Sequence, residues 1–114
     1  MLSCCEEATS PNFYIAAFLE GVASFLLMFV GGSVYVKHQR PYSEAAIYEI
    51  ALVFGAMITI LSHCLRDVSK SHINPIISLA CLLTKRISLL RGFIFIVFQI
   101  GGGKWHIVFY PSSL

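Results

Sequence analysis

The chain has 114 residues, of which 57% are hydrophobic and only 12% are charged, and its mean hydropathy is +0.78. Soluble domains carry about a quarter charged residues, so this composition predicts a membrane protein that forms one domain or part of one. The net charge of +2 is too small to indicate nucleic-acid binding, and the four cysteines show neither zinc spacing nor a disulfide framework. The sequence has no nucleophile–base pair, metal cluster or phosphate loop, so we expect no enzyme, cofactor or metal site.

The first part of the chain predicts a tail followed by two membrane spans. Residues 1–12 are polar and predict an N-terminal tail rather than a signal peptide. The apolar run 13–36 contains a single charge, Glu20, and exceeds the ~20 residues that a span requires. A second apolar run, at 44–65, predicts the next span.

The second span carries a small residue at every fourth position: Ala51, Gly55 and Thr59. Such a stripe allows another helix to approach closely. The alternative is chance spacing in a helix rich in alanine and glycine.

A short apolar run at 75–84 follows a polar segment and begins at Asn74-Pro75. Asn is a preferred N-cap, and Pro is favoured at the first helical position. The run is too short to cross a bilayer. A capped start between longer apolar runs therefore predicts a re-entrant half-helix, which presents the positive end of its dipole at membrane depth. The alternative for Asn74-Pro75 is an ordinary helix cap.

The last apolar run, 88–103, is marginal for a full span and has Arg91 in its first turn, where the side chain can reach the interface. It ends in three glycines. The segment 104–114 is of a different character, and we expect it to be a divergent tail of a truncated product.

Basic residues predict the orientation in the membrane. Five of them flank the half-helix: Arg66, Lys70, Lys85, Arg86 and Arg91. Only Lys37 and Arg40 lie in the opposite loop. The positive-inside rule then places the N-terminus and the half-helix loop in the cytoplasm.

Four blocks of the sequence, in order, resemble motifs of the aquaporin (major intrinsic protein) family, near its animal water-channel or big-brain-like branches. Ser-His-Ile-Asn-Pro-Ile at 71–76 resembles the family's first Asn-Pro box, and Ala-Leu-Val-Phe-Gly at 51–55 resembles its second-helix motif. Glu20 with Ala-Ser-Phe-Leu-Leu-Met-Phe at 23–29 resembles the first helix. The third helix is matched by Lys-Arg-Ile-Ser at 85–88, Arg91 and Gln-Ile-Gly-Gly-Gly at 99–103.

The resemblance implies an all-α membrane protein. Residues 13–103 would form the first inverted repeat, with three transmembrane helices and one half-helix. It also implies a channel for passive transport of water or small neutral solutes in a lipid bilayer, favouring the plasma membrane, and assembly as a homo-oligomer or with a second-half partner.

By the same resemblance, a set of residues would line the pore: Phe54, Lys70, Ser71, His72, Asn74, Pro75 and Ile76. The Asn74 amide would donate to a passing water, and Phe54 would narrow the filter. Backbone carbonyls of Lys70, Ser71 and His72 would form a ladder of acceptors, because irregular backbone can line water. Glu20 would accept backbone N–H bonds and brace the loop.

Each of these residues also has an ordinary interpretation when taken alone. Phe54 could face lipid or pack in the core, and His72 could be an interfacial histidine. Glu20 could start a shorter helix with its charge at the interface.

Three departures from the family pattern bear on conduction. The 114 residues contain one Asn-Pro pair, Ile76 stands where the family has Ala, and Lys70-Ser71 stands where it commonly has Gly-Ala. Lys70 either strains the carbonyl ladder or turns its amine to the cytoplasm. We therefore expect a truncated chain that does not conduct as a monomer. The alternative is a non-conducting membrane protein that associates with full-length channels.

Overall fold

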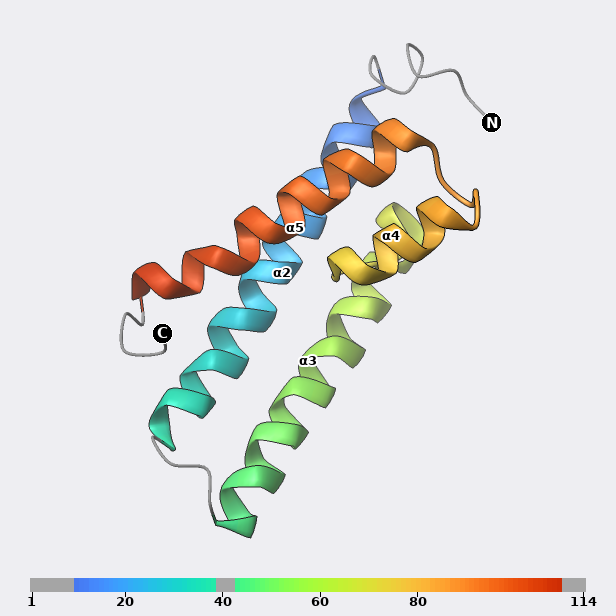
Figure 1. Cartoon of the computed structure of the whole chain (residues 1–114). Coiled ribbons are helices and arrows are strands. Elements are labelled where there is room, and N and C mark those ends of the chain that lie inside the picture. The colour runs from blue at the N-terminus through green and yellow to red at the C-terminus, as the bar shows by residue number, and fades with distance from the viewer. Residues whose placement is uncertain (1–9, 39–42, 110–114) are drawn as a thin grey trace.

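The computed structural model describes residues 10–38 and 43–109, and these residues form helices joined by short connections (Figure 1). The helices are α2 (Pro11–Lys37), α3 (Glu44–Ser69), α4 (Pro75–Leu83) and α5 (Leu89–Phe109). Most of the 1–12 tail, Arg40 of the first loop and the last five residues of the 104–114 segment lie outside the described residues.

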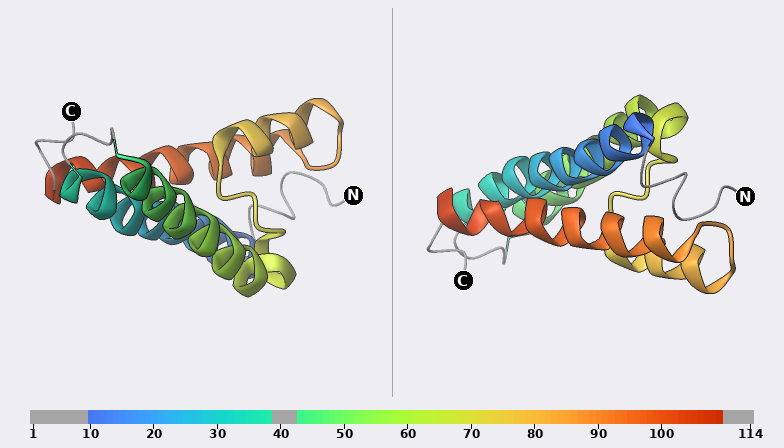
Figure 2. Two further views of the ribbon diagram at one scale, coloured as in Figure 1. Left: turned by 90° about the horizontal axis from the view of Figure 1, so that it is seen from below. Right: turned by 90° about the horizontal axis from the view of Figure 1, so that it is seen from above.

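Helix α2 occupies the centre of the arrangement. It packs against α5 on one side and α3 on the other, whereas α4 packs against α5. Figure 2 shows α2 and α3 as an antiparallel pair, with α4 and α5 forming a second antiparallel pair across them. The short helix is thus joined to the other helices mainly through α5.

The contact between α2 and α5 depends on glycine. A Cβ atom built on Gly102 would lie 2.0 Å from the backbone oxygen of Gly21, and one built on Gly21 would lie 3.1 Å from the backbone oxygen of Phe98. Backbone atoms cannot move aside as a flexible side chain can, so these two helices approach closely only because Gly occupies both positions. Nearby, Ala16, Ala17 and Phe95 form a buried apolar cluster.

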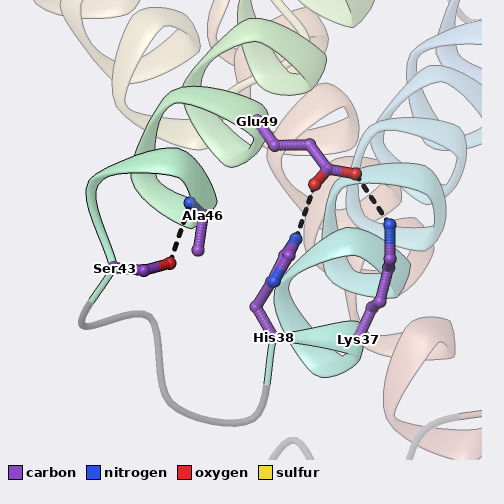
Figure 3. Close-up of polar contacts among 5 residues, drawn as sticks. All are labelled: Lys37, His38, Ser43, Ala46 and Glu49. Carbon is purple, nitrogen blue, oxygen red and sulfur yellow. Dashed lines mark hydrogen bonds and ion pairs between the residues drawn. The ribbon is translucent and has the colours of Figure 1, made fainter.

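The contact between α2 and α3 combines an apolar cluster with a group of polar contacts at one end. Ala23, Leu61, Leu65 and Ile73 form the cluster. At the end of the hairpin, the Glu49 carboxylate accepts a hydrogen bond from Lys37 Nζ (3.1 Å) and lies 2.6 Å from His38 Nε2 (Figure 3).

The same end of α3 is capped by a side chain. Ser43 Oγ accepts a hydrogen bond from the Ala46 N–H at 3.2 Å (Figure 3). This bond satisfies one of the first-turn donors that a helix leaves unpaired.

Two helix ends differ from the sequence-based expectation. Helix α3 continues past residue 65 to Ser69, and α5 continues through the three glycines to Phe109 instead of ending near residue 103. The apolar run was expected to end at the glycines, a residue type with low helix propensity. The packing of Gly102 on Gly21 outweighs that preference, because only glycine fits there.

By length and composition, α2 and α3 can cross a membrane. Helix α5 has 21 residues, about the length of a span, but contains Arg91, Gln99 and Lys104. Its role as a third span remains a prediction.

The small-residue stripe on α3 faces away from the other helices. Ala51, Gly55 and Thr59 are all exposed, and a Cβ atom built on Gly55 would meet nothing within 4 Å. No helix within the described residues covers this stripe.

Candidate functional site

The connection from α3 to α4 has an unusual backbone conformation. Lys70, Ser71 and Ile73 have φ angles of 69°, 56° and 55°. This left-handed region is uncommon for non-glycine residues and an outlier for a β-branched one. Each such residue costs about 1–3 kcal/mol, so surrounding contacts must hold the segment in place.

The buried carboxylate of Glu20 provides the main contacts to this segment. Its Oε1 atom accepts hydrogen bonds from Ser69 Oγ (2.5 Å) and the His72 N–H (3.0 Å). Its Oε2 atom accepts from the Ile73 N–H (2.5 Å) and Gln99 Nε2 (2.8 Å). Four donors from three parts of the chain offset the cost of burying this fully inaccessible side chain.

The segment reaches the middle of the long helices before α4 begins. Ser24 Oγ donates to the Ile73 carbonyl at 3.1 Å, and Ser24 is the central residue of Pro11–Lys37. Gln99, which bonds Glu20, is the central residue of Leu89–Phe109. Helix α4 therefore starts level with the midpoints of α2 and α5.

A second set of polar contacts connects α4 to α5. The Ser78 hydroxyl lies 2.9 Å from His72 Nδ1 and 3.0 Å from Gln99 Nε2. The His72 ring also packs edge-on against Phe95, at a centroid distance of 5.5 Å. Among the described residues, every buried polar side-chain atom has a hydrogen-bond partner, so this network is complete.

Asn74 caps α4 and leaves its amino group unpaired. Its Oδ1 atom accepts from the Ile76 N–H at 2.9 Å, and its backbone carbonyl accepts from the N–H groups of Ile77 (3.1 Å) and Ser78 (3.2 Å). Asn74 is exposed, and Nδ2 has no partner within 10–38 and 43–109. It is thus a donor available to an outside molecule.

Asn74 lies in a groove of about 340 Å³ between α2, the start of α4 and α5. The groove has apolar walls with a few polar groups: Ser24, Asn74, Gln99 and Lys104. This composition is typical of small-molecule sites, where a few polar groups orient the ligand. A larger groove of about 490 Å³ between α2 and α5 is almost wholly apolar, with Phe18, Phe25, Phe98 and Trp105 in its walls.

The residues expected to line a pore divide into two groups. Asn74 and Pro75 line the 340 Å³ groove. The structure does not bring the remaining ones to it: Phe54, Lys70, Ser71, His72 and Ile76.

Several of the remaining residues have other surroundings. Phe54 packs over Gly31, where an added Cβ would lie 2.3 Å from the ring. Ser71 Oγ donates to the Ser62 carbonyl at 2.6 Å, and Ile76 is 73% exposed. The carbonyls of Lys70, Ser71 and His72 accept no hydrogen bond from another described residue. They remain available as acceptors.

Four residues of the network were missing from the sequence-based site: Ser24, Ser69, Ser78 and Gln99. Two of them had a signal in the sequence. Ser78 is the only polar residue between Pro75 and Leu83, and Gln99 is the only polar residue in the run 92–100. A lone polar side chain in an apolar helix requires a partner.

Comparison with known proteins identifies the family. The model of the major intrinsic protein family matches residues 7–108, including part of the segment expected to diverge. The chain is 39% identical to Aquaporin-5 of Homo sapiens over 97 residues, which cover 85% of this chain and 36% of that protein. It is 35% identical to Aquaporin PIP1-5 of Zea mays over 100 residues, covering 85% and 35%.

A fold with two helices able to span a bilayer, by length and composition, fits an integral membrane protein. The chain belongs to the major intrinsic protein family, the membrane channels that include the aquaporins. It spans about a third of the length of the curated relatives that it matches.

Proposed function

We propose that this chain forms the first-repeat half of a membrane channel for water or small neutral solutes. The observation that carries the proposal is the Glu20 carboxylate, which accepts four hydrogen bonds and so fixes the 70–74 segment. Asn74 of this segment lies in a groove level with the middle of α2 and α5. In this arrangement α4 is a re-entrant half-helix.

The chemistry of the groove suits a neutral, hydrogen-bonding solute. The Asn74 amide donates to a water oxygen, while the dipole of α4 disfavours cations at its N-terminus. The carbonyls of Lys70, Ser71 and His72 would extend this contact as a chain of acceptors. Phe54 and Ile76 would reach the solute only in the complete channel, where other walls stand opposite them.

The positive-inside pattern supports a cytoplasmic N-terminus, and the family supports the plasma membrane as location. The exposed apolar faces of α3 and α4 favour assembly, either with further copies or with a second half. Tyr48, Leu52, Ile76 and Leu83 are each more than 70% exposed. Lipid would cover what a partner does not.

The experiment is a stopped-flow swelling assay on vesicles that contain the inserted chain. Conduction predicts water permeability above that of protein-free vesicles, and loss of the increase in Asn74→Leu. Asn12→Leu is the matched control, because Asn12 is exposed in the first turn of α2 and lies outside the groove. Equal permeability with and without verified protein contradicts conduction by this chain alone.

A second candidate function is association with full-length channels without conduction. The observation that favours it is the uncovered stripe of Ala51, Gly55 and Thr59, since small residues let helices approach closely. Co-purification with a full-length family member, lost in Gly55→Leu while water permeability of the chain stays at the lipid level, would support this function.

A further inference from the structure

The groove beside Asn74 contains a full positive charge. Lys104 belongs to the extended part of α5 and lines the groove together with Asn74 and Gln99. It is the only ionisable residue among those that line it. If α5 ended at the glycines, this ammonium group would not be part of the groove wall.

No negative charge in the described part of the chain neutralises Lys104. The ion pairs there involve Glu49 and Asp67, both far along the sequence from α5. Glu20 bonds Gln99 of the groove wall, but its carboxylate is fully buried and accepts four hydrogen bonds. The Lys104 charge therefore acts on the groove undiminished by a salt bridge.

The dipole of α4 also makes the potential in the groove more positive. Helix α4 begins in this groove, so the positive end of its dipole adds to the Lys104 charge. Lys104 is exposed, so at physiological ionic strength its charge reaches over about 8 Å.

We infer that Lys104 is a specificity-determining residue, which makes the groove at Asn74 favour anionic over cationic molecules. The inference rests on the proposed function in that the groove is taken as a solute path. The charge of the groove itself can be measured whether or not the chain conducts.

Thiol modification measures that charge directly. In a chain whose four native cysteines are replaced by alanine, Gly103→Cys places a thiol in the groove wall. An added Cβ at this position meets only Met28 Cγ at 3.7 Å, an ordinary contact. The modification rates of this variant in vesicles are compared for an anionic and a cationic methanethiosulfonate of similar size. Ile100→Cys, also in the groove wall, provides a second position.

The reference position is Gly55→Cys on the exposed face of α3, where a Cβ atom meets nothing. Relative to this reference, we expect the anionic reagent to be favoured by about tenfold in the groove. Lys104→Met should remove the preference, whereas Lys104→Arg and the control Lys85→Met should retain it. Lys85 is exposed and lies outside the groove.

Equal anion preference in the groove and at the reference position would overturn the inference, as would a preference that survives Lys104→Met. Water permeability is measured on the same vesicles. Unchanged water permeability would contradict conduction by this chain. The ratio of the anionic to the cationic modification rate would still decide the role of Lys104.

Discussion

The Glu20 carboxylate accepts a hydrogen bond from the backbone N–H of Ile73 at 2.5 Å, across 53 positions of sequence. Ile73 has a φ angle of 55°, a conformation that its β-branched side chain disfavours. The bond therefore stabilises the one residue of the segment least suited to its backbone. Ser24 Oγ donates a hydrogen bond to the carbonyl of the same residue.

Replacing Glu20 by Gln should destabilise the fold by about 2–4 kcal/mol, because an amide offers one acceptor where the carboxylate serves four donors. Thermal unfolding in detergent measures this effect. The control Glu49→Gln removes an exposed ion pair, which solvent screens, and should change the unfolding temperature little. Equal effects of the two substitutions would contradict the assigned role of Glu20.

The Gly102→Ala substitution should separate α2 from α5, since the added Cβ would lie 2.0 Å from a backbone oxygen. We expect a loss of at least about 1–3 kcal/mol, read from the unfolding midpoint. Gly103→Ala, one residue away, meets only a flexible methionine at 3.7 Å and should be tolerated. If both variants unfold at the same temperature, α2 and α5 do not approach as closely at Gly102 as described.

Gly31 and Phe54 should be coupled. Gly31→Ala forces its methyl group into the Phe54 ring, and we expect a loss of about 1–3 kcal/mol. Much of this loss should disappear when Phe54 is Ala, so a double-mutant cycle should give a non-zero interaction energy. Additive effects would show that Phe54 does not pack on α2.

Lys70→Gly should stabilise the chain by about 0.5–1 kcal/mol, because Lys70 is exposed with a φ of 69° and ends α3 in the left-handed conformation that glycine prefers. Lys85→Gly, at a φ of 59°, should act in the same direction. Chemical denaturation of both variants measures the gain. A lower stability of Lys70→Gly would indicate that the Lys70 side chain makes a stabilising contact that glycine cannot make.

The sequence predicted the helices and the capped start of α4 well, because apolar runs and an Asn-Pro cap are local signals. It did not predict that Gln99 and Ser78 share a network with Glu20, since that depends on how α2, α4 and α5 come together. The end of α5 was misplaced for the same reason. Glycine at 102 is unfavourable within one helix and required between two.

The positions of the charged side chains at the site were the hardest feature to predict from the sequence. Lys104 was assigned to a tail of different character, and only the continuation of α5 brings it into the groove with Asn74. The role of Glu20 came from a resemblance rather than from its position, because a single acid in an apolar run has several ordinary interpretations.

The most direct test of the account is amide hydrogen exchange at His72 and Ile73, the two backbone donors to Glu20. In the inserted wild-type chain both amides should exchange slowly although they lie in a loop, because their opening requires release from the carboxylate. In Glu20→Gln both should exchange at least tenfold faster, while amides in the middle of α2 stay protected. Rapid exchange in the wild type, or unchanged protection in Glu20→Gln, would contradict the claim that Glu20 holds the segment that presents Asn74.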